Sequence, residues 1–399
     1  MNHFKLNIHD LNFILTFSGF AIFTSFFADV SSIVYRAFAL LVALLCLLKS
    51  SFKLADIPTL VKVLLAFIII LDLKIAYHLL FDISIIYIPA KRMALLFVFG
   101  VTLIPVLAFS AGYKHIHWKS VLVVLELLLF ITILKSYLST IDEMDAVRMA
   151  LNNRQSTIAY GDNSSYLFIL SLCLLRCPSE MKNRLVRSFW VFFLICGTIL
   201  GLIGMIRAGS RGPVISAVMG LAFYFVSLKF RKQMGFLATS VFLIAFFGIS
   251  TVTLEKVAPV LFSRMYNAIE EGDTSGRDIL FREAIAKIKD NPIEGDNPII
   301  LSNNGQFTTC HNGYLTVGVC LGVLGLFFYV MLTIWIAIRL ILCRVNINSS
   351  EGFFIASMYF LSITRAMTGA DIASNPNYAV MIVAASILIS KAKYEKGKL

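Results

Sequence analysis

The sequence predicts an all-α polytopic membrane protein, because both its composition and its hydrophobic runs argue against a water-soluble globule. Of its 399 residues, 58% are hydrophobic and 15% are charged, and the mean hydropathy is +0.83. That leaves too little polar surface to cover a soluble protein of this mass. Apolar runs of about 20 residues recur along the chain, and in hydrocarbon a helix satisfies every backbone amide within its own segment. A membrane β-barrel would instead show short alternating segments.

About twelve transmembrane helices are expected from these runs, and most of the connections between them are short. One transmembrane domain over residues 1–399 is therefore predicted, without a separate soluble domain. The first apolar run begins near Leu11 and is expected to be a retained span rather than a cleaved signal peptide. The expected spans are 11–27, 31–48, 58–80, 93–112, 120–138, 163–176, 188–206, 212–228, 234–252, 313–338, 353–366 and 377–390.

Basic residues define the orientation of these spans. With the N-terminus in the cytoplasm, every inner loop is basic, as the positive-inside rule requires, and both termini are cytoplasmic. The net charge of +12 then follows from topology, and no nucleic-acid partner is expected. The inner basic residues are Lys49, Lys53, Lys114, Lys119, Arg176, Lys182, Arg184, Arg187, Lys229, Arg231, Lys232, Arg339, Arg344, Lys391, Lys393, Lys396 and Lys398.

Residues 253–311 form the longest polar stretch and are expected to make one large loop on the outer side of the membrane. Within it, residues 275–289 place apolar side chains on one helix face, and Asp290-Asn291-Pro292 ends that helix. Ser275 is the expected cap, and Arg277 lies near the N-terminus, where free amides and the helix dipole favour an anion. Residues 294–305 are expected to be irregular.

This loop ends in Cys310-His311-Asn312-Gly313-Tyr314, where hydrophobicity resumes. His311 therefore brings a titratable ring to a membrane edge, and with an ordinary pKa of about 6.5 it could serve as a general base. The alternative is a capping or packing histidine at a helix start. His78 lies near another outer end with less supporting context, and His115 and His117 are expected to be surface residues of an inner loop.

Four arginines are candidates for a pyrophosphate clamp. Arg207 and Arg211 flank Ala-Gly-Ser between two spans, and Arg277 and Arg282 lie on the loop helix. Guanidinium groups pair bidentately with phosphate oxygens, and the nearby glycines could let a ligand approach the backbone. The alternative is interfacial snorkelling. Arginines on the outer side depart from the positive-inside rule, and binding of a polyanion would explain them.

Other charged residues have two interpretations each. Asp72 and Lys74, in the third span, could form a relay or a structural pair with another span. Lys91, Arg92 and Arg365 lie at expected outer ends, where they could extend the clamp or anchor the interface. Asp371 could add a carboxylate to an outer cavity or lie in a solvated loop.

No metal or nucleotide motif is present in the sequence. It has no Asp-x-Asp pair, no His-Glu-x-x-His and no P-loop, so no cofactor is expected and the reaction would have to draw its energy from the substrate. Of the seven cysteines, Cys310 alone is expected outside, so no structural disulfide is predicted.

Several short motifs occur in an informative order: Ser210-Arg211-Gly212, Ser275-Gly276-Arg277, Asp290-Asn-Pro-Ile-Glu-Gly295, and His311-Asn312 before Gly322-Val-Leu-Gly325-Leu. Together they resemble the bacterial O-antigen ligase superfamily, which contains O-antigen ligases and repeat-unit polymerases. The resemblance covers mainly residues 200–330.

This resemblance implies a membrane glycosyltransferase of the GT-C type, located in the bacterial inner membrane with a periplasmic active site. The donor would be a glycan on undecaprenyl pyrophosphate, and the reaction would be metal-independent and inverting. Arg211 and Arg277 match the family's pyrophosphate-contacting arginines, and His311 matches the histidine that activates the acceptor. Arg207 and Arg282 are added from charge and spacing alone.

Three functions remain open at this point. A repeat-unit polymerase, whose acceptor is another lipid-linked repeat, is favoured because the loop around His311 is compact, and it implies a chain-length-regulating membrane partner. An O-antigen ligase, whose acceptor is lipid A-core, is the alternative. A transporter of lipid-linked oligosaccharide is a remote third, because carriers place their key polar residues near the midplane of the membrane.

Overall fold

Among the residues that it describes, the computed structural model contains helices and two strands of two residues each. It describes residues 5–27, 32–50, 57–81, 102–139, 157–176, 183–226, 262–263, 266, 277–298, 300–301, 307–308, 310–342, 349–369 and 376–396. The all-α prediction is confirmed. Four helices are long and apolar enough to cross a membrane in these parts of the chain, and they are Trp118–Leu138, Ile158–Leu175, Arg184–Arg207 and Gly313–Leu342.

The first span is continuous but contains a π-turn. It consists of α1 (Ile8–Ile14), η1 (Leu15–Gly19) and α2 (Phe20–Phe26). The side chain of Asn7 caps it by accepting hydrogen bonds from the amides of His9 and Asp10. This helix begins three residues before the expected span because Asn7 provides a polar start that hydropathy does not register.

The remaining helices follow the expected spans wherever the structure describes them. The expected span 234–252 lies outside the described residues. The helices are α3 (Ser32–Lys49), α4 (Thr59–Phe81), α6 (Ile104–Gly112), α7 (Trp118–Ser139), α8 (Thr157–Arg176), α9 (Arg184–Arg207), α10 (Arg211–Val226), α14 (Arg277–Asp290), α15 (Gly313–Leu342), α16 (Ser350–Thr368) and α17 (Pro376–Lys396).

Two expectations for the loop region need correction. Residues 294–305 are not wholly irregular, because β1 (Ile300–Leu301) pairs antiparallel with β2 (Phe307–Thr308). The span expected at 313–338 extends to Leu342 and is broken at Gly322, whose φ of 67° and ψ of −169° are not helical. Its first half runs from Gly313 to Leu321, and its second half from Val323 to Leu342.

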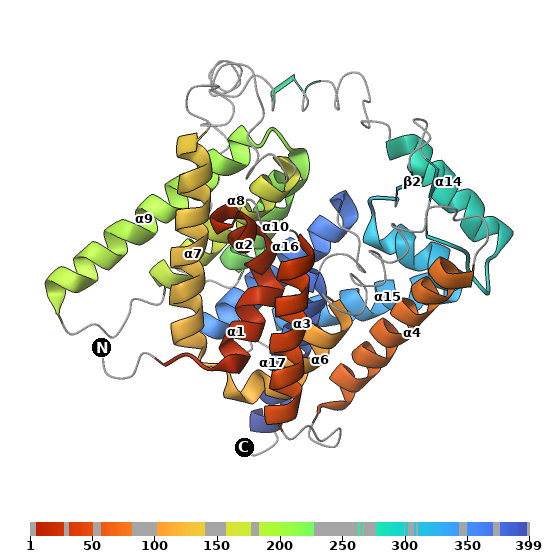
Figure 1. Ribbon diagram of the computed structural model, residues 1–399, viewed down its shortest axis with the longest axis horizontal. Helices are drawn as coiled ribbons and strands as arrows, with labels where there is room; N and C mark the ends of the chain where they lie inside the picture. The colour runs from red at the N-terminus through yellow and green to blue at the C-terminus, as the bar shows by residue number, and fades with distance from the viewer. Residues whose placement is uncertain are drawn as a thin grey trace.

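One large core holds the bundle together. Residues 380–385 of α17 are fully or almost fully buried, and α17 packs against α4, α6, α15 and α16. Aromatic rings from distant segments meet nearby, with Phe13 of α1 lying 5.6 Å from Phe109 of α6 between ring centroids. Figure 1 shows α14 at one edge of the molecule beside α15, and α9 extending to the other edge.

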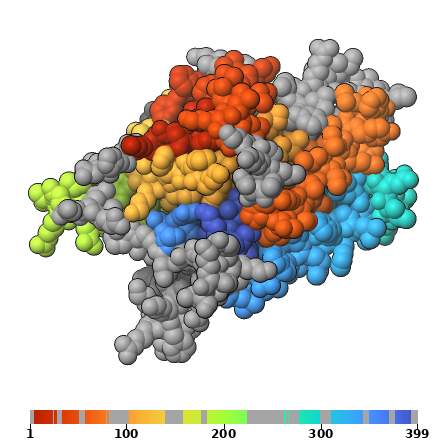
Figure 2. Space-filling model, turned by 90° about the horizontal axis from the view of Figure 1, so that it is seen from below, coloured from red at the N-terminus to blue at the C-terminus, as the bar shows by residue number. Residues whose placement is uncertain are grey.

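A row of glycines brings α8 and α9 into close contact. A Cβ atom at Gly197 would lie 2.6 Å from both Glu126 Oε1 and Ser171 Oγ, and one at Gly201 would lie 2.8 Å from the backbone nitrogen of Phe168. Small residues at this spacing let membrane helices approach until their backbones touch. The opposite face of α9 carries exposed apolar side chains, and residues of this helix lie at one edge of the molecule (Figure 2).

Candidate functional site

The C-terminal end of α16 is the point where the candidate residues meet. Arg277 Nη1, at the start of α14, donates a hydrogen bond of 2.6 Å to the carbonyl of Thr368. Asn312 Nδ2, just before α15, donates one of 3.2 Å to the carbonyl of Met367. The last carbonyls of a helix lack partners within the helix. Here they accept from the two segments that carry Arg277 and His311, so these two residues are brought to one place.

Arg365 forms a buried ion pair beneath this meeting point. Its Nε lies 2.6 Å from Asp162 Oδ1 of α8, and the two side chains are only 4% and 16% exposed. Nη1 also donates to Thr368 Oγ1 at 3.3 Å. A charge-assisted hydrogen bond this short ties α16 to α8. Arg365 is therefore neither a snorkelling anchor nor a solvent-facing clamp residue, but one half of an internal pair.

Two glycines leave the room that these guanidinium groups occupy. A Cβ atom at Gly212 would lie 3.0 Å from Arg365 Nη1, and one at Gly369 would lie 2.9 Å from Arg365 Nη1 and 3.4 Å from Arg277 Nη2. Gly369 also has a φ of +144°, which side chains rarely adopt. Gly212 thus makes room for Arg365 of the protein itself. On the sequence alone, the glycines near Arg211 were instead expected to let a ligand approach the backbone.

His311 lies beside these arginines in an unusual backbone conformation. Among the described residues it is the non-glycine residue with positive φ, at 49°, and such conformations cost energy that the surroundings must supply. Asn312 Oδ1 caps α15 by accepting from the amides of Tyr314 and Leu315. The capping function that the alternative interpretation gave to His311 therefore belongs to Asn312.

The surroundings of His311 favour its neutral form. Its pKa is lowered from the usual histidine value, first by desolvation of the ring and then by the positive charges of Arg277 and Arg365. A neutral imidazole at neutral pH is the form that can accept a proton. The two neighbouring arginines thus help to keep the ring able to act as a base.

Arg207 and Arg211 lie on either side of a tight turn between α9 and α10. Gly209 adopts a left-handed φ of 57° there, and its amide donates to the carbonyl of Ile206 at 3.1 Å. Because Gly212 of the same helix start touches Arg365, Arg211 belongs to the same end of the bundle as Arg277 and His311. Arg207 ends α9 directly before this turn.

Arg282 is not brought into this cluster. Its Nη2 lies 2.9 Å from Asp278 Oδ2 one turn earlier in α14, and its side chain is 75% exposed. An exposed pair of this kind is worth about 0.3–0.5 kcal/mol. Of the four proposed clamp arginines, Arg282 is the one that the structure directs to the helix surface.

Several candidates lie outside the described residues: Lys91, Arg92, Ser275, Gly276 and Asp371. Asp72 and Lys74 lie on α4, two positions apart, so they do not face each other on the helix. His78 is on the same helix. In the described parts of the chain, no group of three or more His, Cys, Asp or Glu side chains lies close enough to hold a metal ion.

Sequence reasoning missed Asp162 and Glu126, and it named Asn312 only as part of a motif, without a role. Asp162 pairs with a residue 203 positions away, and no spacing rule marks such a partner. Glu126, which is fully buried in α7, accepts from Ser171 Oγ at 2.6 Å. A carboxyl group inside an apolar run is itself a signal for a buried polar contact. The sequence does not show, however, which residue of another helix makes that contact.

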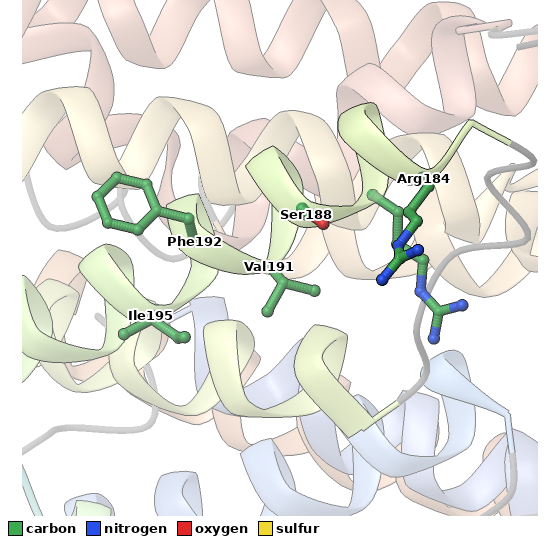
Figure 3. A pocket seen from close by; sticks show the side chains of 6 residues that line it. Arg184, Ser188, Val191, Phe192 and Ile195 are labelled. Carbon is green, nitrogen blue, oxygen red and sulfur yellow. The ribbon is translucent and has the colours of Figure 1, made fainter.

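A surface groove of about 390 Å³ lies elsewhere, along the first half of α9 (Figure 3). Arg184 and Arg187 lie at one end of it and Phe192 and Ile195 at the other. Arg207 ends the same helix twelve positions beyond Ile195, a rise of about 18 Å. This groove is therefore separate from the cluster around His311.

The fold and the cluster together define a class of protein: a multispan helical membrane protein with arginines and a histidine gathered at one end of the bundle. The comparison with known families gives the particular family. Residues 196–330 match the family model described as O-antigen ligase (Wzy_C), which confirms the resemblance to the O-antigen ligase superfamily over that segment. A comparison with curated proteins found no match.

The matched segment contains the main parts of the cluster. It includes the turn with Arg207 and Arg211, the helix start with Arg277, and His311 with the first half of α15. Asp162 and Arg365 lie outside it, on α8 and α16. Helices beyond the matched segment therefore supply the buried ion pair on which the cluster is built.

Proposed function

We propose that this protein is an inner-membrane glycosyltransferase that moves a glycan from undecaprenyl pyrophosphate to an acceptor hydroxyl at the periplasmic face. The observation that carries the proposal is the convergence of Arg277, His311 and the buried Arg365 at the end of α16. The family match over residues 196–330 supports the same assignment. A chain-length-regulating membrane protein is a proposed partner.

In the proposed reaction, the acceptor oxygen attacks the anomeric carbon and the bond from that carbon to the phosphate oxygen breaks. The imidazole of His311 takes the proton of the acceptor hydroxyl, and the electron pair of the broken bond leaves with undecaprenyl pyrophosphate. Attack opposite the leaving group inverts the anomeric carbon. A general base of this kind contributes about 10²–10⁴-fold in rate.

The arginines would stabilise the charge that develops on the leaving pyrophosphate. Arg277 and Arg211 are the proposed phosphate contacts, with Arg207 beside them, because guanidinium groups match the geometry of phosphate oxygens. Each well-placed charge stabiliser could supply about 3 kcal/mol of transition-state stabilisation. These groups suffice for a metal-independent reaction, since the sugar is already activated by its pyrophosphate link.

A repeat-unit polymerase is the favoured form of this activity, and a ligase that uses lipid A-core is the second candidate, supported by the description of the matched family. Both remove the glycan from the same carrier, so the residues of the donor side do not separate them. Deletion of the gene in its native host separates them on a gel. Core with a single repeat unit indicates a polymerase, and bare core with long polymer on undecaprenyl pyrophosphate indicates a ligase.

An unchanged surface glycan in the deletion strain would contradict both forms of the proposal. Transport of a lipid-linked oligosaccharide is the remaining alternative. It would leave the lipid-linked repeat on the cytoplasmic side of the membrane in the deletion strain.

A further inference from the structure

The break in α15 includes an exchanged hydrogen bond. In a continuous α-helix the amide of Val323 would donate to the carbonyl of Val319, four residues earlier. Here Val323 N donates instead to the carbonyl of Pro292 at 2.8 Å, and the carbonyl of Val319 accepts from Asp296 N at 2.5 Å. The loop after α14 is thus inserted between the carbonyl of Val319 and the amide of Val323, and both of these groups have a hydrogen-bond partner in the loop.

Two glycines make this insertion possible. Gly322 has a φ of 67° and Gly295 a φ of 73°. A Cβ atom at Gly322 would collide with the carbonyl oxygen of Pro292, and one at Gly295 would collide with the carbonyl of Cys320. Since these neighbours are backbone atoms, they cannot move aside as a flexible side chain would. Both positions therefore require glycine for conformation and for space.

Packing extends the connection along α14. Ile288 of α14 fits against Gly318, where a Cβ atom would lie 2.8 Å from its Cδ1. Lys287 Nζ donates to the carbonyl of Asn297 at 2.9 Å and lies 3.4 Å from Asp296 Oδ2. A separate hydrophobic cluster joins α14 to the first half of α15, and its members are Leu280, Ala284, Ile288, Cys310 and Val319.

We propose that Gly295 and Gly322 are positioning residues, which hold α14 and the first half of α15 as one rigid unit that presents Arg277 and His311 together. Arg277 begins α14 and His311 lies two residues before α15, so the two functional side chains lie at one end of this unit. The exchanged bond lies at the other end. The proposal rests on the proposed glycosyl transfer and adds residues that contact neither donor nor acceptor.

The physical reason is that a half-helix alone would not fix the position of His311. From Gly313 to Leu321 the first half of α15 is about 13 Å long, and α14 is about 21 Å long over its 14 residues. Joined by the exchanged bond and the shared apolar face, they act as a single body. Displacement by about 1 Å at a reacting group can reduce the rate by about 100-fold, so the connection has a direct kinetic consequence.

The test is Gly322→Ala in the full-length protein. Alanine favours a continuous helix, which restores the bond from Val323 to Val319 and expels the loop. Transfer from the lipid-pyrophosphate donor should fall by about 100-fold, while the protein remains inserted. Hydrogen exchange at residues 291–297 should become faster. Gly220→Ala is the matched control, because its Cβ atom would meet neighbours at 3.3 Å that need only a small shift.

The pH–rate profile separates positioning from a general loss of stability. If the unit moves, Arg277 leaves His311, and the acid limb of the profile should move up towards the ordinary histidine value. Gly295→Ala changes a loop rather than a spanning helix, so it can replace Gly322→Ala if that variant fails to insert. It should give the same slower transfer, faster hydrogen exchange and shifted acid limb. Transfer within twofold of wild type and unchanged exchange at 291–297 in both variants would overturn the proposal.

Failure of the proposed function has a different signature. If the wild-type protein transfers no glycan but Gly322→Ala still accelerates exchange at residues 291–297, the exchanged bond is correct and the assigned reaction is wrong. If the wild type is active and neither glycine variant changes rate, pH profile or exchange, the reaction is correct and the positioning role is wrong.

Discussion

The two ends of the bundle both contain a histidine beside a charged partner, but the partners have opposite sign. At the end formed by α1 and the turn before α7, His117 Nδ1 lies 2.9 Å from Asp10 Oδ2, and Asp10 is fully buried. At the end of α16, His311 lies beside Arg277 and Arg365. We call these the carboxylate end and the arginine end.

The carboxylate end is closed by contacts within the protein. Asp10 accepts from the amides of Asn7 and His117 as well as from the His117 ring. Nearby, Tyr113 donates to Glu351 at 2.7 Å, and Lys391 lies 4.4 Å from the centre of the Tyr113 ring. These contacts tie α1, α16 and α17 to the short segment between α6 and α7, so the first and last helices are anchored to the same segment. The polar groups of the carboxylate end stabilise the fold.

The arginine end has more positive than negative charge among the residues described. Arg277, Arg365 and Arg211 lie there, and Asp162 is the carboxylate that pairs with one of them. Excess charge of one sign in a confined place attracts ions of the other sign. The comparison teaches that a histidine indicates function when the groups around it carry an excess of one charge, which favours binding of an oppositely charged ligand.

The largest effect is expected from substitution of the proposed base. His311→Asn should reduce glycan transfer by about 10²–10⁴-fold, because asparagine tolerates the left-handed backbone at this position but cannot accept the proton. His117→Asn is the matched substitution at the carboxylate end, and it should leave transfer unchanged. Surface glycan on gels from complemented deletion strains gives the measurement. Equal loss in both variants would remove the distinction between the two ends.

Loss of a clamp arginine should have the next largest effect. Arg277→Gln should lower transfer by about 100-fold, which corresponds to about 3 kcal/mol of transition-state stabilisation. Arg282→Gln, five residues along the same helix, should change transfer by less than about twofold because its exposed pair with Asp278 is weak. Initial rates with purified protein test this pair. A larger loss for Arg282→Gln would restore the four-arginine clamp expected from sequence.

The buried ion pair should matter more for stability than for chemistry. Asp162→Asn keeps the volume but leaves Arg365 as a buried charge without its counter-charge, a change that costs about 3–5 kcal/mol. Thermal unfolding in detergent should show a clearly lower Tm. A Tm equal to that of the wild type would show that the pair does not hold α8 to α16.

The pH dependence of transfer should reflect the lowered pKa of His311. Activity needs the neutral ring, so it is lost as pH falls through the pKa of the ring, below the ordinary value of about 6.5. Arg277→Gln removes one of the positive charges that lower this pKa, so the acid limb should move to higher pH. The pH–rate profiles of both proteins provide the measurement. A limb that stays in place would mean that another group titrates.

The smallest effect on activity is expected at the carboxylate end. Asp10→Asn weakens its hydrogen bonds to the Asn7 and His117 amides and removes the ion pair with His117. Stability should fall by about 1–3 kcal/mol, as for other buried hydrogen-bonded groups, while the rate per folded molecule is unchanged. Transfer rates normalised to the amount of folded protein test the expected rate, and Tm tests the expected loss of stability. A loss of rate at constant Tm would assign a catalytic role to this end.

Sequence patterns predicted the helices well because hydropathy depends only on residues close together in the chain. The same is true of the spacing of apolar residues in the helix within the polar loop. The expected helix at 275–289 appears as α14, and its buried residues Leu280, Ala284 and Ile288 belong to the predicted apolar face. Ile285, another apolar residue of the same helix, is 44% exposed.

The contacts that hold the site together were not predictable because each joins distant segments. The bonds of Arg277 to Thr368, Asn312 to Met367 and Arg365 to Asp162 depend on which helix ends meet. The break at Gly322 was equally hidden, since glycine within an apolar run does not by itself indicate that a loop enters the helix. The motifs ending in Gly295 and starting at Gly322 were noted separately, and the structure shows that they touch.

The most direct test of the central claim is a single-turnover transfer assay with purified wild type, His311→Asn and His117→Asn, supplied with an undecaprenyl-pyrophosphate-linked glycan and an acceptor glycan. The account predicts transfer by the wild type and by His117→Asn, and loss of about 10²–10⁴-fold for His311→Asn. Transfer by His311→Asn at the wild-type rate would contradict the assignment of the arginine end as the catalytic site.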